Sequence, residues 1–382
     1  MVAEVRRGTS RRKVAQMFGV SKSNVDRWVE RAEGKRLDRV DWSDRASGQP
    51  VAHNRTASRV EERVIRLRKE LKEISALGEY GAEAIQREMT GKGYPVVLPI
   101  RTINNILQRR GQFDGSRRIR RPAPPKGWYL PNLAEGKAEL DSFDVVEGLV
   151  IKGGHHVEVL NGISLHGGLV CSWPRSRITA RIVANAILRH WRQFGLPDYV
   201  QFDNGTIFQG PRKPDALGRV ARMALSVGVM VVYAPPRETG FQAAIESYNG
   251  RWQRKVWNRF HFSSRVHLQS QSDKYVRAAR RRAFTCRAES VERRPLPDDR
   301  EVDYQNPGGV VIFIRRTTDN GNVCLLGRTF KVSKTWPHRL VRAEVNLSES
   351  RIDFYVLRRR DPSCQPLLKS VNYHFPDRPF LE

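Results

Sequence analysis

Apolar residues repeat at helical spacing in the first third of the chain, mark alternating strands and helices in its middle, and form only short strand-like runs in its tail. The middle part runs in the order of three strands, a helix, a strand, a helix, a strand and a helix. This order predicts an α/β layer architecture with a mixed sheet. The tail lacks long helical patterns, and its short strands predict a small β-barrel.

The changes of pattern predict a multidomain chain, and its 382 residues allow two or three domains with real cores. The predicted parts are an all-α helix-turn-helix domain at 1–48, a second helical, helix-turn-helix-like domain at 58–112, a linker rich in arginine and proline at 113–137, an α/β core at 138–290 and a β-barrel domain at 300–382.

The segment TSRRKVAQMFGVSKSNVDRWVERA at 9–32 has the pattern of a helix-turn-helix unit. Gly19 breaks the first predicted helix, and Ser21 can cap the second. The apolar faces consist of Val14, Ala15 and Phe18 on the first helix and Val25, Trp28 and Val29 on the second. The residues left to face a DNA major groove are Lys22, Ser23, Asn24 and Arg27. A small helical hairpin with a basic face is the alternative interpretation.

A second helical unit follows a polar linker. Ser58 and Glu61 have capping-box spacing, and apolar residues then recur at helical intervals. Basic exteriors favour a second DNA-binding domain, whereas a helical spacer or dimerisation element is the alternative. The segment RRIRRPAPPKGWYLPN at 117–132 predicts an extended cationic connector, in which Arg120 and Arg121 could contact a phosphate backbone.

The charge of the chain points to a polyanionic partner. It has 68 Lys and Arg against 40 Asp and Glu, a formal net charge of +28. Neutralising phosphates is the main non-specific source of nucleic-acid affinity. A membrane surface would also attract such a chain, but no long apolar segment and no signal-peptide pattern are present. The four cysteines lack C-x-x-C spacing, which disfavours zinc and disulfide frameworks and fits a reducing cytosol.

Three acidic residues fall on separate predicted elements of the α/β part. Asp203 ends the strand-like run that begins at Tyr199, Glu246 lies near the start of a helix, and Asp141 lies in the strand candidate ELDSFDVV. Each alone has an ordinary interpretation as a turn residue, a solvated helix residue or a strand-end polar residue. Together they are what a divalent-metal site needs, because hard oxygen ligands suit Mg²⁺ or Mn²⁺.

These motifs carry a resemblance to a known family. ELD with Asp141, QFDNGTIF with Asp203 and APPRETGFQAAIESYNGRWQ with Glu246 resemble the integrase-type core of DDE transposases, and the whole chain resembles a bacterial insertion-sequence transposase. The resemblance implies a ribonuclease-H-like catalytic core at 138–290 in which Asp141, Asp203 and Glu246 bind the metal. It also implies two Mg²⁺ or Mn²⁺ ions, double-stranded DNA as partner, a homo-oligomer on that DNA, and a cytoplasmic, nucleoid-associated bacterial protein.

Two departures from the family pattern leave alternatives open. The separation of Asp203 from Glu246 is longer than is usual, and Glu238 lies closer to the usual distance. We favour Glu246, because Asn249 follows it at i+3 as in the family and because GPRKPDA at 210–216 resembles a loop insertion. Asp144 lies three residues after Asp141, and therefore on the other face of a regular strand. It is the reserve candidate.

Aromatic and basic residues are interleaved after the third motif, where Arg251 and Lys255 are candidates for DNA contact. The neighbouring aromatic residues recur at helical spacing, so packing is the favoured interpretation for them. The predicted function is a transposase that binds terminal inverted repeats, cuts the DNA ends and joins them to target DNA. The alternatives are a domesticated DNA-binding regulator with an inactive core and a nuclease that only hydrolyses.

Overall fold

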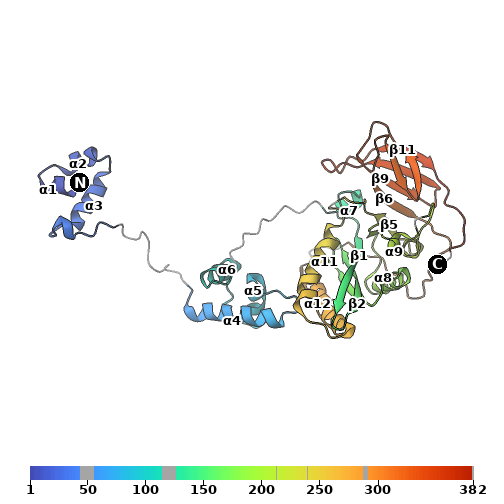
Figure 1. Cartoon of the computed structure of the whole chain (residues 1–382), viewed down its shortest axis with the longest axis horizontal. Helices are drawn as coiled ribbons and strands as arrows, with labels where there is room; N and C mark the ends of the chain where they lie inside the picture. Colours follow the sequence, from blue (N-terminus) through green and yellow to red (C-terminus); the bar gives the residue numbers. More distant parts are fainter. Residues whose placement is uncertain (44–55, 114–125, 212, 239, 287–290, 381–382) are drawn as a thin grey trace. The chain divides into compact units, whose positions relative to one another are not determined.

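The computed structural model describes residues 1–43, 56–113, 126–211, 213–238, 240–286 and 291–380 (Figure 1). These residues separate into two compact units, Met1–Glu61 and Glu62–Glu382. No helix among the described residues is both long enough and apolar enough to cross a membrane. Arg120 and Arg121 of the predicted connector lie outside the described residues.

The N-terminal unit contains the helices α1 (Val2–Arg6), α2 (Arg11–Met17) and α3 (Lys22–Arg31) and a short 3-10 turn at Leu37–Arg39. Gly19, between α2 and α3, has a φ of 62°, which glycine adopts without a steric penalty. The Ser21 hydroxyl accepts a hydrogen bond of 3.3 Å from the backbone N–H of Asn24 and caps α3. The break and the cap therefore lie where the sequence pattern places them.

The contact between α2 and α3 is small and apolar. Val14, Ala15 and Val25 are buried in one cluster. Phe18 was expected on the same face but is 49 % exposed, because it caps the C-terminal end of α2 instead of continuing its apolar stripe.

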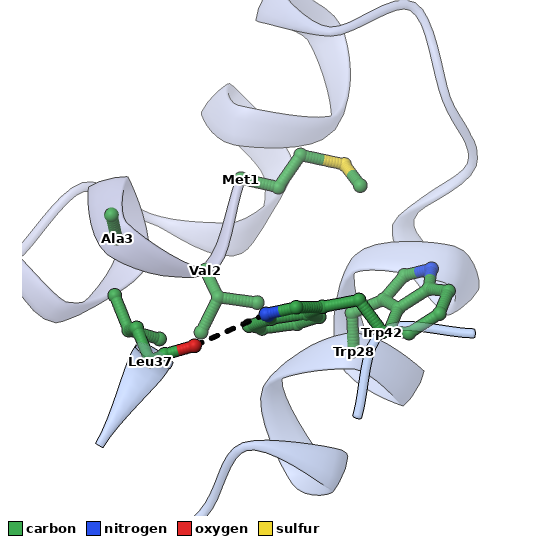
Figure 2. A pocket seen from close by; sticks show the side chains of 6 residues that line it. All are labelled: Met1, Val2, Ala3, Trp28, Leu37 and Trp42. Atoms are coloured by element: carbon green, nitrogen blue, oxygen red, sulfur yellow. Dashed lines mark hydrogen bonds between the residues drawn. The ribbon is translucent and has the colours of Figure 1, made fainter. Parts of the chain in front are cut away.

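An apolar pocket of about 430 Å³ lies beside α1 and α3 (Figure 2). The rings of Trp28 and Trp42 are 5.7 Å apart, and the Trp42 indole N–H donates to the Leu37 carbonyl at 3.1 Å. The remaining lining residues are Met1, Val2 and Ala3. All six lining side chains are apolar or aromatic.

Three further helices follow, α4 (Ser58–Ile74), α5 (Ala82–Gly91) and α6 (Ile100–Arg109). Their fully buried apolar residues include Val64, Ile85, Ile103, Ile106 and Leu107. The apolar stripe of α4 ends at Leu71, since Ile74 is 68 % exposed.

The second unit is built on a mixed sheet, which in the described residues has nine strands in the order β11-β10-β9-β6-β5-β4-β1-β2-β3. β1, β2 and β3 pair antiparallel, whereas β4 and β5 run parallel to β1. The mixed α/β sheet is therefore confirmed. The strands of this central part are β1 (Leu140–Ile151), β2 (His155–Ser164), β3 (Val170–Arg175), β4 (Tyr199–Phe202) and β5 (Met230–Tyr233).

Helices cover both faces of this central part. On one face, residues of α8 (Ala180–Phe194) and α10 (Arg219–Ser226) share a buried apolar cluster with the strands; the short α9 (Thr206–Gln209) contacts α10. On the other face, α11 (Ala243–Lys255) and α12 (Arg265–Cys286) form a second cluster with β1 and β2. A 3-10 turn, Trp257–Arg259, follows α11.

The C-terminal strands extend the core sheet and do not form the separate β-barrel predicted for 300–382. β6 (Val310–Arg316) pairs in parallel with β5, and β9 (Leu340–Asn346), β10 (Arg351–Val356) and β11 (Leu367–Asn372) follow as antiparallel neighbours out to the edge. The buried run along β6 explains the error, because a strand that is apolar on both faces belongs inside a covered sheet. Two strands, β7 (Asn322–Leu325) and β8 (Arg328–Lys331), form a separate hairpin.

The predicted linker at 113–137 extends too far toward the core. Trp128 and Tyr129 are buried against Phe241, with ring centroids 5.2 Å from it in each case, and α7 (Pro131–Ala134) follows. Two aromatic side chains bury too much apolar surface to be left in an extended connector. The described end of this segment is therefore part of the core.

Candidate active site

The two aspartates of β1 lie on opposite faces of the sheet. Side chains alternate along a strand, and Phe143 belongs to the apolar cluster of α8, whereas Val146 belongs to that of α11. Asp141 therefore shares the α8 face with Phe143, and Asp144 shares the α11 face with Val146. Because Glu246 lies in the first turn of α11, it is Asp144 that lies on its side of the sheet.

The parallel pairing of β1 and β4 supports the same assignment. Asp141 pairs with Val200 and Ser142 pairs with Gln201. Continued by two residues, this register brings Asp144 beside Asp203, the residue that follows β4. Neighbouring strands are about 4.8 Å apart, so these two carboxylates are close neighbours.

A hydrogen-bonded chain joins α11 to this point. The Asn249 amide donates to Asp144 Oδ2 at 2.7 Å, and the Asn161 amide on β2 donates to Asn249 Oδ1 at 2.8 Å. Asn249 lies one helical turn after Glu246, so the bond fixes the part of α11 that carries the glutamate. Asn249 and Asn161 were not singled out as site residues from the sequence, although the Glu-x-x-Asn spacing pointed to the first of them.

The electrostatics of Asp144 show that the carboxylates share one environment. Burial raises the pKa of Asp144, and the negative charges of Asp203 and Glu246 raise it further. Hydrogen bonds from the Val145 N–H and from Asn249 oppose the shift. A carboxylate held with two others on separate elements is unfavourable when ionised unless a cation compensates it.

Buried polar atoms around Asp144 lack partners among the described residues. Ser142 Oγ lies on the same face of β1, Asn161 Oδ1 lies opposite Asp144 on β2, and Gln242 Nε2 lies at the N-cap of α11. Each carries a desolvation cost unless a water, an ion or a substrate supplies the missing bond. The unpartnered atoms thus lie on β1, on the neighbouring strand β2 and at the start of α11, around Asp144 and Glu246.

Asp141, the candidate from the ELD motif, lies apart from this group, on the other face of β1. It is 1 % exposed, and its two oxygens accept hydrogen bonds of 2.9 and 2.7 Å from the Arg293 guanidinium, with further bonds from Ser164 and Trp191. Burial alone would raise its pKa, but the bonds and the charge of Arg293 hold that pKa below its usual value. Asp141 has a structural ion pair and no oxygen left for a metal.

The carboxylate of Glu238 is also engaged in ion pairs. It forms ion pairs with Arg316 and, at 3.3 Å, with Arg359. Both arginines come from the C-terminal part of the chain. Glu238 therefore fastens the loop before α11 to that part, whereas Glu246 is exposed on the first turn of the helix.

Asp203 has a supported position at the end of β4. Its Oδ1 accepts a bond of 2.9 Å from the Gly205 N–H. The next residue, Asn204, donates to the Ala234 carbonyl at 2.7 Å and accepts from Arg315 at 2.7 Å. Arg315 is buried, and burial lowers its pKa to about 10. The turn that carries Asp203 is therefore fixed to β6.

The predicted DNA-contacting residues differ in their availability. Lys22 and Arg27 are exposed on α3, although Lys22 pairs with Asp26 at 2.7 Å; Ser23 contacts Ser21, and Asn24 is half-buried. Arg251 is exposed on α11. Lys255 instead donates to the Gly78 carbonyl at 2.7 Å, so it fastens α11 to the helical segment before the core.

No three His, Cys, Asp or Glu side chains among the described residues form a preassembled metal cluster. The donor set still fits a hard divalent cation, since Asp144, Asp203 and Glu246 supply carboxylate oxygens from three elements and Asn161 Oδ1 is an unused acceptor beside them. The fit rests on the chemistry of these donors and on the raised pKa of Asp144.

No protein-family model and no curated protein sequence matches the chain. Several solved structures do. A chain of the simian T-cell lymphotropic virus intasome in complex with PP2A regulatory subunit B56 gamma is 13 % identical, with a TM-score of 0.32, over 68 % of this chain and 84 % of that one. The catalytic core of BIV integrase is 15 % identical, with a TM-score of 0.27, over 36 % and 80 %.

The catalytic core of HTLV-2 integrase in complex with magnesium, in its dimeric form, is 15 % identical, with a TM-score of 0.25, over 38 % of this chain and 82 % of that one. These TM-scores are too low for the likeness to assign a function.

Proposed function

We propose that this chain is a DNA-processing phosphoryl transferase of the DDE transposase type, with Asp144, Asp203 and Glu246 as its acidic triad. The observation that carries the proposal is geometric: the Asn249 amide bonds the helix of Glu246 to Asp144, and the β1–β4 register brings Asp203 to the same point. The raised pKa of Asp144, to which the charges of Asp203 and Glu246 contribute, agrees with this arrangement. The net charge of +28 supports a nucleic-acid substrate. Asp144 thus replaces Asp141 in the assignment made from the sequence.

The three carboxylates would hold Mg²⁺ or Mn²⁺. When bound, a pair of such ions supplies Lewis-acid stabilisation of the attacking and leaving oxygens of an in-line displacement. The protein residues position this chemistry. Asn249 orients Asp144, the Asn204–Arg315 bond holds the turn of Asp203, and the Asp141–Arg293 pair fixes the start of β1 from the opposite face.

The reaction consists of two displacements at phosphorus. In the first, a water oxygen attacks a phosphodiester, the P–O3′ bond breaks and the 3′ oxygen leaves as a hydroxyl. In the second, that 3′-hydroxyl attacks a target phosphodiester and loses its proton, a new P–O bond forms, the target P–O3′ bond breaks and the displaced 3′ oxygen leaves as a hydroxyl. The start of α3, with Lys22, Ser23, Asn24 and Arg27, would read the terminal repeats. The protein would act inside the cell as an oligomer on DNA.

Purified protein, supercoiled plasmid and short duplexes carrying the ends of the element test this proposal. Wild type should nick DNA and form joined products only with Mg²⁺ or Mn²⁺, and Asp203→Asn should do neither while still binding DNA. Asp299→Asn removes an equal charge at an exposed loop position and serves as control. Nicking without joined products would favour the hydrolytic nuclease, and binding without nicking would favour the inactive regulator.

A further inference from the structure

An arginine-lined groove lies at the edge of the sheet, between β3, α8 and α12. Two adjoining cavities of about 350 and 480 Å³ share Arg175 on β3 and Asp273 and Arg277 on α12. Arg189 and Arg280 line the first cavity, and Arg265 lines the second. None of these residues belongs to the carboxylate site. Arg277 and Arg280 lie in the segment YVRAARRRAF at 275–284, where the sequence interleaves aromatic and basic residues.

The described lining of this groove is strongly positive, with five arginines against the single carboxylate of Asp273. Among the described residues, none of its five arginines forms an ion pair. Arg175 donates to the Pro174 carbonyl and Arg280 to the Val170 carbonyl, which holds these side chains in place without neutralising them. Asp273 is the acidic residue lining both cavities, and its Oδ1 accepts from Gln269.

The arginines are close enough to repel one another. Burial lowers the pKa of Arg175, and the charges of Arg189 and Arg265 lower it further, while Asp273 acts in the opposite direction. His190, which also lines the groove, adds no positive charge, because burial lowers its pKa to about 3. Like charges held together from three elements are favourable only when an anion occupies the space between them.

We propose that this groove binds the phosphate backbone of duplex DNA at a site separate from the carboxylates. A single small anion would use one cavity, whereas arginines spread along two adjoining cavities suit successive phosphates of one strand. A second copy of the same face is disfavoured by charge repulsion. The groove adds to the proposed function, but it does not depend on the carboxylate chemistry.

The test measures binding of random-sequence duplex DNA to the full chain without divalent cations, in an Asp203→Asn background. The pair Arg175→Gln and Arg277→Gln should reduce the slope of log affinity against log salt concentration by about 1.8, since each lost phosphate contact contributes about 0.9. Arg181→Gln with Lys274→Gln removes the same charge from exposed positions of α8 and α12 outside the groove, and should change the slope far less. The double variant Arg175→Lys with Arg277→Lys keeps the positive charge and should retain most of the wild-type slope.

Equal slopes for the groove and control pairs, with both proteins folded by circular dichroism, would overturn the proposal. So would a preference of the groove for poly-glutamate over DNA that disappears in the groove pair, because that result would identify an acidic protein partner. Neither outcome depends on nicking activity, so failure of the groove and failure of the proposed reaction are distinguishable.

Discussion

The two aspartates of β1 have opposite environments on the two faces of the central sheet. On the α8 face, Asp141 is fully buried and receives hydrogen bonds from Arg293, Ser164 and Trp191. On the α11 face, Asp144 is half-buried, and its pKa is raised by burial and by two neighbouring carboxylates. Within the described part of the chain, buried polar atoms near it lack partners. The ion-paired Asp141 stabilises the fold. The carboxylate of Asp144, which lacks a basic partner among the described residues, is the one expected to bind a ligand.

The largest expected effect separates Glu246 from Glu238. Glu246→Gln should abolish metal-dependent nicking, because it removes a carboxylate of the triad, whereas Glu238→Gln should at most slow it by loosening the loop held by Arg316 and Arg359. Nicking of supercoiled plasmid by the two purified variants measures the difference. If the Glu238 variant is the inactive one, the carboxylate assignment on α11 is incorrect.

Asp141→Asn should reduce stability more than any single change on the α11 face. Breaking a buried ion pair by removing one partner costs about 3–5 kcal/mol, and Arg293, with a side chain 8 % exposed, would be left without its carboxylate. Urea unfolding of the variant measures this loss. The milder Ser164→Ala removes one donor and should cost about 1 kcal/mol. An Asp141 variant with wild-type stability would contradict the scaffold role.

Asn249→Ala should impair the reaction while leaving the protein folded. It frees Asp144 and removes the link to Asn161, and loss of a partner that orients a metal ligand typically reduces affinity or activity about 10- to 100-fold. Nicking rates at saturating and limiting Mn²⁺ measure the effect. The control is Ser247→Ala, which changes an exposed side chain of α11 directly after Glu246. Equal rates for the two variants would show that the amide does not position Asp144.

Sequence selectivity should be lost by changes in the other unit. Replacing Asn24 and Arg27 with alanine should cost about 1–3 kcal/mol for each base pair whose readout is lost, while leaving binding to scrambled DNA nearly unchanged. Titration of specific and scrambled duplexes measures this difference. Equal weakening of both duplexes would mean that α3 contacts only the backbone.

The smallest effect concerns pH. The raised pKa of Asp144 means that its ionised form opposes folding, so this cost appears as pH rises through its titration range. The lowered pKa of Asp141 works in the other direction, because its stabilisation is lost as pH falls through its own range. Without divalent cations, Asp144→Asn should therefore raise Tm near neutral pH and lose this advantage in acid. Unchanged Tm at both pH values would contradict the unfavourable charge at Asp144.

The pattern of the sequence predicted the mixed sheet of the core. Two of the acidic residues selected from the sequence, Asp203 and Glu246, are also members of the proposed triad. It placed Asp141 in that triad because ELD matched a family motif, although strand alternation already put Asp144 on the other face. The choice needed the position of α11, which packs on the face of Val146. The pairing of β6 with β5 could not be predicted either, because parallel partners far apart in sequence leave no local signal beyond a continuous apolar run.

Binding of Mn²⁺ to the Asp144→Asn and Asp141→Asn variants tests the central assignment most directly. Titration calorimetry, at a temperature where circular dichroism shows each protein folded, should find that the Asp144 variant loses Mn²⁺ binding while the Asp141 variant retains it. Ser164→Ala takes the place of the Asp141 variant if that protein does not fold. Retained binding in Asp144→Asn, with binding lost when the contacts of Asp141 are removed, would contradict the account.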